Sequence, residues 1–378
     1  MIYNNILGLI FSNMHDESVS ELTQVRTMGS ILFGGRYRLI DFPLSNMTNS
    51  GIPEVGVVTK SNYQSLLDHI GSGREWDLCT KNGGIHLLPP FSHHKSGLYR
   101  GRIEAIEGIL PFIQHSNAEY VVMADCDVVT TIDFRQVIRE HMKNDADITV
   151  VYAKHNFTNN GIGSTASTIL EVDDEKRVIS ATINPDILGE ANRSLNMFVI
   201  GRRILEKIVS RYAPEGFASF DKQVLQQNKA NYRICGYEHK GYYEKIEDIM
   251  SYYNANMNLL NPENMQKMFL NNTPIYTKVK DSGPAKYEAG SVVRNSLIAD
   301  GCVIEGEVIN SVLFRGVKVG KGAVVRNCIL MQNTQIGEDA ELHAVITDKN
   351  VRVGKNKLLT ASTKNALFIK KNQKIEDD

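Results

Sequence analysis

The most constraining feature of the sequence is a short repeat near its carboxyl end. Val319-Gly320, Ile336-Gly337 and Val353-Gly354 are equivalent apolar-glycine pairs, and each follows the previous one by 17 residues. Within one such interval, apolar residues recur six positions apart. This spacing predicts about three hexapeptide-like units per coil, which is typical of a parallel β-helix. The alternative is a run of antiparallel hairpins, but hairpins rarely keep so regular a spacing. We therefore expect a β-helix domain over residues 291–378.

The first two thirds of the chain have a different pattern, in which short apolar runs alternate with helical stretches. Four runs have the continuous apolar character of strands that are covered on both faces: Ile6–Phe11, Val55–Val58, Tyr120–Met123 and Ile148–Tyr152. Strands that alternate with helices predict a doubly wound α/β domain with a mostly parallel sheet. Because ligands bind beyond the carboxyl ends of such strands, Asp125 and Asp127 are placed where a site is expected.

The pattern also predicts where the domains end. Residues 251–260 have the character of a helix, which we expect Asn261-Pro262 to terminate. The stretch that follows is rich in proline and glycine. The predicted organisation is an α/β domain over residues 1–260, an irregular linker over 261–290 and the β-helix over 291–378.

Composition excludes several classes of function. The 42 basic and 43 acidic residues nearly cancel, so no overall field favours nucleic acid or an anionic membrane. The five cysteines are odd in number and widely scattered, which argues against a disulfide framework or a zinc site. The chain shows neither a signal sequence nor a membrane-spanning run of apolar residues. These features predict a cytoplasmic protein.

One segment shows a specific resemblance. Residues 31–46 read Ile-Leu-Phe-Gly-Gly-Arg-Tyr-Arg-Leu-Ile-Asp-Phe-Pro-Leu-Ser-Asn. They resemble, almost letter for letter, the sugar-binding segment of bacterial ADP-glucose pyrophosphorylases, and the resemblance extends to residues 251–260 and to the repeat. It implies a Rossmann-like nucleotidyltransferase domain followed by a left-handed β-helix. It also implies the conversion of ATP and glucose 1-phosphate into ADP-glucose and pyrophosphate.

The resemblance assigns roles to individual residues. It implies that three glycines contact the nucleotide: Gly8, Gly34 and Gly35. It implies that three other residues contact the sugar phosphate: Tyr99, Gly101 and Ser194. Asp127 aligns with the magnesium-binding, catalytic aspartate of the family.

The chain departs from the family at the positions on which the chemistry depends. Phosphoryl transfer needs a backbone cradle for the phosphates, a cation and carboxylates that hold magnesium. No glycine occurs between Gly8 and Gly29, so we do not expect the cradle. The family's phosphate-facing lysine falls on Met28, and Lys245 stands where the second metal-binding aspartate is expected. A lysine at that position repels Mg²⁺.

Ser219 replaces another acid of the family. In the sugar-phosphate half of the site, the family residues are replaced by Arg102-Ile103-Glu104 and by Ile183-Asn184. We therefore expect no intact catalytic set, with Asp127 vestigial, no metal site and no cofactor requirement in this chain. This combination of losses resembles the GlgD type of the family, a glycogen-biosynthesis subunit. It implies a regulatory chain in a hetero-oligomer, in which a catalytic homologue binds Mg²⁺ and is activated by this chain.

Two other functions stay open. One is an active nucleotidyltransferase with a rearranged site built from Asp125, Asp127 and Arg102. The other is an acyltransferase with His343 as general base, which leaves the first domain without a role. Basic residues near the predicted domain junction are candidates for a pocket that binds an anionic effector: Arg36, Arg38, Lys278, Lys280 and Arg315.

Overall fold

The fold is taken from a computed structural model that describes residues 5–80, 83–90, 99–157, 167–216, 219–227, 229–270 and 273–376. Its first domain is built on four parallel strands in the order β6 (Tyr120–Asp125), β1 (Ile6–Phe11), β4 (Glu54–Val58) and β5 (Gly84–Leu88). All six residues of β1 are buried, as expected for a central strand covered on both faces. The predicted parallel core is therefore confirmed.

Helices cover both faces of this core. Alternate residues of β1 belong to two separate apolar clusters, with Ile6 and Ile10 in one and Leu7 and Leu9 in the other. The first cluster includes residues of α2 (Asp41–Asn49), α3 (Gln64–Ile70) and α6 (Phe134–Lys143). The second includes residues of α4 (Arg102–Gly108), α5 (Leu110–His115) and α7 (Arg202–Tyr212). This is the doubly wound arrangement that the sequence predicts.

A second group of strands extends the sheet beyond β6. The long strand β11 (Gly189–Gly201) runs antiparallel to β6 and pairs on its other edge with β8 (Ile148–Phe157) and β9 (Thr168–Val172). β10 (Val178–Ile183) pairs with β9, and β12 (Ile234–Glu238) runs parallel to β8. The strand predicted at residues 148–152 is present, but it lies in this mixed part of the sheet and not in the parallel core.

The predicted linker over residues 261–290 is partly wrong. α8 (Ile249–Asn258) is followed at once by α9 (Pro262–Phe269). Asn261 caps α9, since its side-chain oxygen accepts a hydrogen bond from the Glu263 backbone N–H at 2.9 Å, and Pro262 occupies the first turn. The Asn-Pro pair therefore begins a second helix, and the first helix ends before it is reached. The first β-helix strand, β14 (Lys286–Tyr287), also starts before the predicted boundary.

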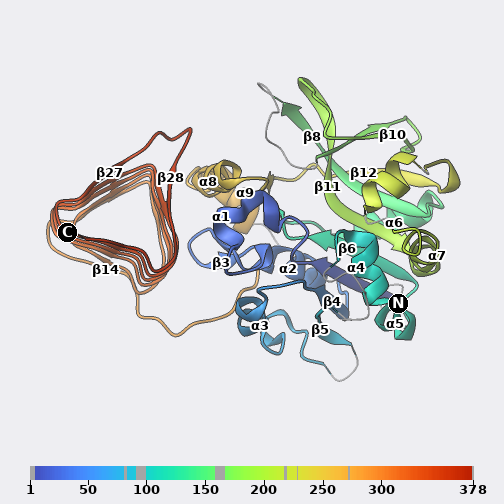
Figure 1. Ribbon diagram of the computed structural model, residues 1–378, viewed down its shortest axis with the longest axis horizontal. Helices are drawn as coiled ribbons and strands as arrows, with labels where there is room; N and C mark the ends of the chain where they lie inside the picture. Colours follow the sequence, from blue (N-terminus) through green and yellow to red (C-terminus); the bar gives the residue numbers. More distant parts are fainter. Residues whose placement is uncertain are drawn as a thin grey trace.

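The carboxyl-terminal domain is a parallel β-helix with three faces, which Figure 1 shows end-on as a triangle. Each face is a stack of short parallel strands, and one face runs β14, β17 (Val303–Ile304), β20 (Lys318–Val319), β23 (Gln335–Ile336), β26 (Arg352–Val353) and β29 (Lys374–Ile375). Val319, Ile336 and Val353 stack in register along it. The predicted coil is thus confirmed, and the hairpin alternative is wrong because these rungs pair in parallel.

The other two faces are built in the same way. The second consists of β15 (Val292–Arg294), β18 (Glu307–Ile309), β21 (Val324–Arg326), β24 (Glu341–His343) and β27 (Leu358–Thr360). The third consists of β16 (Leu297–Ile298), β19 (Val312–Leu313), β22 (Ile329–Leu330), β25 (Val345–Thr347) and β28 (Leu367–Ile369). Glycine is required at the corners: a Cβ on Gly337 would lie 2.7 Å from the Gly354 carbonyl carbon.

The two domains share a core. One apolar cluster runs from the α/β domain through Tyr253 on α8 to Ile329 and Ile346 on the third β-helix face. A buried ion pair adds to this contact, because Arg26 donates to both carboxylate oxygens of Asp348 at 2.8 Å. None of the helices in the described part of the chain has the length and hydrophobicity of a transmembrane span.

Candidate functional site

The candidate site lies at the carboxyl end of β6, where Asp125 ends the strand and Asp127 follows it. Both carboxylates are buried, with residue exposures of 1%. The short strand β7 (Val128–Thr130) then pairs antiparallel with β13 (Tyr243–Lys245), and this register sets Lys245 opposite Val128. Lys245 thus lies next to Asp127, although more than a hundred residues separate them in the sequence. The Lys245 ammonium lies 3.8 Å from Asp127 Oδ2 and donates to the Ser194 carbonyl at 3.2 Å.

Arg102, the first residue of α4, neutralises the other aspartate. Its guanidinium donates to Asp125 Oδ2 at 2.6 Å and to Asp221 Oδ2 at 3.2 Å. The same group lies over the ring of Phe198, 4.9 Å from its centroid, so its apolar face is covered as well. Arg102 is 5% exposed. This cation therefore forms a fixed part of the protein interior.

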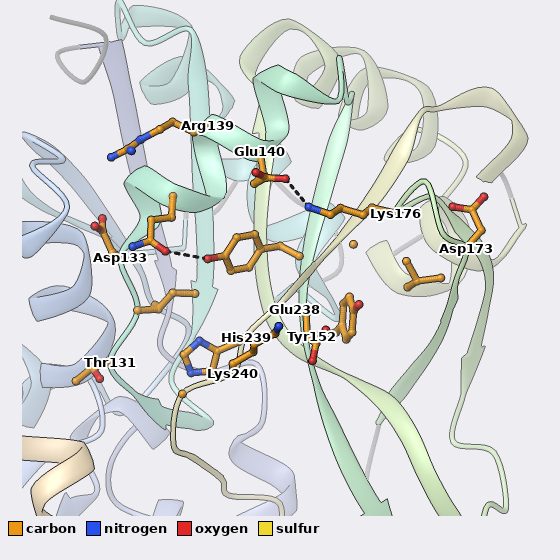
Figure 2. Close-up of a pocket in the computed structure, with 16 residues that line it drawn as sticks. Thr131, Asp133, Arg139, Glu140, Tyr152, Asp173, Lys176, Glu238, His239 and Lys240 are labelled. Carbon is orange, nitrogen blue, oxygen red and sulfur yellow. Dashed lines mark hydrogen bonds and ion pairs between the residues drawn. The ribbon is translucent and has the colours of Figure 1, made fainter.

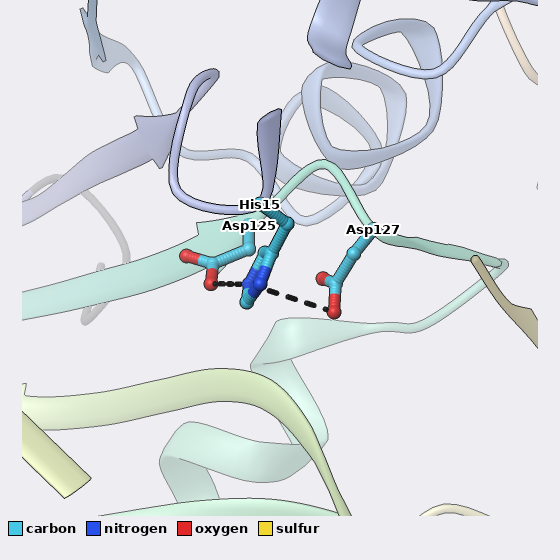
Figure 3. A group of neighbouring side chains, drawn as sticks. All are labelled: His15, Asp125 and Asp127. Atoms are coloured by element: carbon cyan, nitrogen blue, oxygen red, sulfur yellow. Dashed lines mark hydrogen bonds and ion pairs between the residues drawn. The ribbon is translucent and has the colours of Figure 1, made fainter. Parts of the chain in front are cut away.

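A histidine that the sequence analysis did not select lies between the two aspartates (Figure 3). His15 Nε2 is 2.8 Å from Asp125 Oδ2 and 3.6 Å from Asp127 Oδ2. Burial disfavours the charged imidazolium, but the two carboxylates outweigh it and raise the pKa of His15. The imidazole therefore lies within reach of both carboxylates, and these favour its protonated form.

Asn196 completes the cluster through a bulge in β11. The pairing of β11 with β8 shifts register between Ser194 and Met197, and Asn196 has a φ of 55°. Asparagine is one of the few residues that tolerate this left-handed conformation. Its side-chain amide donates to Asp127 Oδ2 at 2.7 Å. The bulge thus directs a neutral donor at the carboxylate.

A magnesium ion does not fit this donor set. Ligand atoms of His15, Asp125 and Asp127 lie within 4.8 Å of one another, and Oδ1 of each aspartate is buried without a hydrogen-bond partner. However, Arg102 and Lys245 hold the opposite oxygens. A single positive charge 4 Å from a divalent ion opposes binding by about 8 kcal/mol at an effective dielectric constant of 20. Histidine is also a poor ligand for a hard cation that prefers oxygen.

The loop after β1 is packed against the core and does not form an open cradle. It contains the short helices η2 (Asp16–Val19), α1 (Ser20–Thr23) and η3 (Met28–Ser30). A hydrogen bond connects the start of this loop to its end, because one carboxylate oxygen of Asp16 accepts from the Met28 backbone N–H at 2.8 Å. Burial raises the pKa of Asp16 to about 6. Val19, Leu22 and Met28 all join the apolar core. Met28 therefore serves as a core residue.

The predicted sugar-phosphate residues fall around this cluster. Ser194 is fully buried and its carbonyl accepts from Lys245. Gly101 precedes the first turn of α4, which carries Arg102. Tyr99 is 8% exposed, and its buried hydroxyl makes no hydrogen bond within the described part of the chain. The structure thus brings Ser194 and Gly101 next to the charged cluster, while their contact with a sugar phosphate stays a prediction.

The three glycines assigned to nucleotide have other surroundings. Gly8 lies inside β1, where a Cβ would come within 2.5 Å of Met47 Sδ. Gly34 and Gly35 form a turn with φ of 57° and 81°. A Cβ on Gly34 would meet Leu259 at 3.2 Å, and one on Gly35 would meet the Leu313 carbonyl of the β-helix at 3.7 Å. Packing at the domain junction accounts for this turn, and its nucleotide contact stays a prediction.

The predicted basic residues do gather between the domains. Partial burial lowers the pKa of Lys280, and the charges of Arg38, Arg315 and Lys278 lower it further. Lys349, on the loop after β25, joins them and was not among the predicted residues. Burial and the charges of Arg38 and Arg26 lower the pKa of Lys349 to about 7. Burial is the largest cause of this shift, and the repulsion from Arg38, Arg26 and Lys280 adds to it.

Two further features lie outside the charged cluster. A cavity of about 800 Å³ separates α6 from β12 and the loop after it (Figure 2). Tyr237 donates to Gln136 at 3.2 Å, and Lys176 is paired with Glu140 at 2.6 Å.

His343, the proposed acyltransfer base, lies in β24 with Nε2 3.0 Å from the Asn327 amide and Nδ1 3.0 Å from the Ala361 carbonyl. Both of its ring nitrogens are thus engaged in the wall of the β-helix.

Comparison with known proteins gives the family. The model for nucleotidyl transferases matches residues 18–264, and the model for the GlmU-like C-terminal hexapeptide domain matches residues 283–364. The chain is 36% identical over 327 residues to the glycogen biosynthesis protein GlgD of Bacillus subtilis. The aligned region covers 86% of this chain and 84% of that protein. The chain belongs to the glucose-1-phosphate adenylyltransferase family, and it is of the GlgD type.

Other similar proteins include both GlgD proteins and glucose-1-phosphate adenylyltransferases. The glycogen biosynthesis protein GlgD of Geobacillus stearothermophilus is 36% identical over 85% of this chain and 83% of its own length. A glucose-1-phosphate adenylyltransferase of Clostridium perfringens strain SM101 is 31% identical over 86% of this chain and 84% of its own length. The sequence similarity to an adenylyltransferase therefore extends over most of the chain.

Among the residues that sequence reasoning missed, His15 had a detectable signal. It follows the carboxyl end of β1, which is where a parallel sheet places its ligands. Asn196 and Asp221 had no such signal, because each reaches the cluster only through long-range strand pairing and packing.

Proposed function

We propose that this chain is a regulatory subunit in glycogen biosynthesis, with weak or no catalytic activity of its own. It assembles with a catalytic homologue that converts ATP and glucose 1-phosphate into ADP-glucose and pyrophosphate, and it raises that homologue's activity. The observation that carries the proposal is the occupation of both site aspartates by internal cations, Arg102 on Asp125 and Lys245 beside Asp127.

The charges of the cluster support a structural role for the former site. Four carboxylates face three permanent cations and one histidine with a raised pKa: Asp125, Asp127, Asp221 and Glu247, and Arg102, Arg193, Lys245 and His15. The permanent cations among them oppose the binding of Mg²⁺ with its nucleotide next to these aspartates. A buried pair that is fully matched keeps the fold intact, whereas the loss of one partner is costly. The cluster therefore preserves the domain without its reaction.

The basic residues at the domain junction support a role in regulation. Arg38, Lys280 and Lys349 come from the first domain, the connecting segment and the β-helix, so an anion bound among them contacts all three parts. We propose that this junction binds an anionic metabolite and couples it to the partner's activity. A ligand that contacts both domains can change their relative stability, which is a requirement for such coupling.

The partner and the compartment are part of the same proposal. We place the complex in the cytoplasm, where Mg²⁺ and ATP bind the catalytic subunit. Four of the five cysteines are buried as free thiols and one, Cys79, is exposed, which suits a reducing compartment.

The test is a comparison of three purified samples: this chain, the catalytic homologue of the same organism, and the two expressed together. Pyrophosphate release from ATP, glucose 1-phosphate and Mg²⁺ is measured for each, and the masses are determined by light scattering. We expect negligible turnover for this chain alone, a mixed oligomer, and a higher kcat or lower KM for the mixture. Turnover of this chain at the rate of the homologue supports instead the rearranged site of Asp125, Asp127 and Arg102. An unchanged partner mass and rate contradicts regulation.

A further inference from the structure

A groove between α8 and the β-helix has an unusual composition. It has a volume of about 610 Å³, which lies in the range of ligand pockets. Ten described residues line it, and none of them carries an ionisable acid or base that is charged at neutral pH, although 22% of the chain is charged. Half of the lining residues are asparagines. This composition disfavours phosphorylated ligands and charged peptides, which require opposite charges.

The amides in this groove have unused hydrogen-bonding capacity. Asn310 accepts from Asn295 at 2.8 Å, so within the described residues its own NH₂ group stays available. Asn327 uses its NH₂ group on His343, which leaves its carbonyl oxygen available. Asn254, exposed on α8, makes no side-chain hydrogen bond to any described residue. Asn254 can therefore both donate and accept, as a sugar hydroxyl does, while Asn310 can donate and Asn327 can accept.

The groove also has apolar surface beside these amides. Met257 and Leu260 on α8 are partly buried, and Tyr253 is 3% exposed with its hydroxyl donating to the Asn327 carbonyl at 2.7 Å. This contact fixes α8 against the β-helix, so the two walls are held in place. An apolar strip flanked by neutral donors and acceptors suits a ligand with C–H faces and hydroxyl edges.

An insertion in the β-helix forms the rim of the groove. Arg352 and Lys374 begin successive strands of one face and are 22 residues apart, whereas earlier coils on that face take 15 or 17. The extra residues form a loop that brings Thr363 to the groove, and its base is anchored where the Ala366 N–H donates to Met250 Sδ at 3.3 Å. Insertions in repeat proteins commonly build the binding face.

From these observations we propose that the groove binds a neutral oligosaccharide. Asn254, Asn310, Asn327 and Thr363 provide the polar contacts to its hydroxyls, and Met257 contacts its C–H surface. The choice of an α-glucan as the probe rests on the proposed function, whereas the location and chemistry of the groove do not.

The experiment measures binding of maltoheptaose to this chain alone by calorimetry, with migration in glycogen-containing native gels as a second readout. Asn254→Ala and Thr363→Ala should each weaken binding about five- to tenfold, the loss expected for one hydrogen bond. Asn258→Ala is the matched control, because Asn258 lies on the same helix outside the groove and donates to Glu244.

Two results overturn the oligosaccharide site. One is the absence of binding of maltoheptaose, and of cellohexaose as a second neutral glycan, to the wild-type chain. The other is an unchanged glycan affinity in Asn254→Ala with a loss of assembly with the catalytic homologue, which assigns the groove to a protein partner. Because glycan binding is measured without the homologue, failure of this proposal leaves the regulatory proposal standing, and failure of regulation leaves this one standing.

Discussion

Lys245 Nζ lies 3.8 Å from Asp127 Oδ2, because the antiparallel pairing of β13 with β7 sets Lys245 opposite Val128, the residue after Asp127. The lysine thereby occupies the space next to the carboxylate that a second acidic ligand needs. Both side chains are buried, so water screens their interaction little. We propose that this pair preserves the packing of the site while it opposes metal binding.

Replacing Lys245 with an acid should create a response to magnesium. Lys245→Asp removes a cation and adds a carboxylate beside Asp127, so it should unfold more easily without metal. We expect Mg²⁺ to stabilise this variant by about 2–3 kcal/mol once it exceeds its dissociation constant about 100-fold. Thermal unfolding with and without Mg²⁺ measures the effect. Lys240→Asp, at an exposed lysine nearby, should show no such response. Equal stabilisation of the wild-type chain contradicts our interpretation of the site.

The buried pair between Arg26 and Asp348 should be important for holding the domains together. Arg26→Ala leaves the Asp348 carboxylate buried without its bidentate partner, which should cost about 3–5 kcal/mol. The matched control is Arg326→Ala. Arg326 donates to Glu307 at the same 2.8 Å, but it is half exposed, so we expect a loss of about 0–1 kcal/mol. Urea unfolding followed by fluorescence compares the two variants, and similar losses argue against the proposed lock.

Much of the fold follows from local patterns in the sequence. The apolar runs of β1, β4 and β6 and the 17-residue repeat have short-range signatures, and each predicted element is present. The start of α9 was missed because Asn-Pro ends one helix as readily as it begins another, and only packing distinguishes the two. The antiparallel strands around β11 were missed because the pairing partner of a strand is not encoded within that strand.

The site shows the same limit. Lys245 and Met28 were found by comparison with a motif, and the structure gives each a definite role, one as an internal cation and the other as a core residue. His15 and Asn196 reach Asp127 across the fold, from a loop and from a bulge. Gly34 and Gly35 show the converse, since a family motif indicated a ligand while the observed neighbours belong to the domain junction.

The stability of the chain should depend on pH through Lys349. Its pKa in the folded chain is about 7, below the ordinary value of 10.5, so the charged lysine destabilises the folded state most at pH below 7. This penalty should fall as the pH rises from 7 towards 10.5. Lys349→Met should therefore stabilise the chain by about 2–4 kcal/mol at pH 6.5 and by progressively less at higher pH. Urea unfolding from pH 6.5 to 9.5 tests this. Lys371→Met, at an exposed lysine, should show no pH-dependent gain, and a gain for Lys349→Met that rises with pH has the wrong sign.

An anion at the domain junction should reverse that penalty. Inorganic phosphate near Lys280 and Lys349 compensates their mutual repulsion, so phosphate should raise the unfolding temperature of the wild-type chain more than sodium chloride of equal ionic strength. Lys280→Ala removes one of the cations and should reduce the phosphate-specific shift by at least half, because a pocket that binds through charge depends on each cation. Lys371→Ala should keep the full shift. If phosphate stabilises both variants equally, or acts no differently from chloride, the junction is not an anion site, and the basic residues there serve only in packing between the domains.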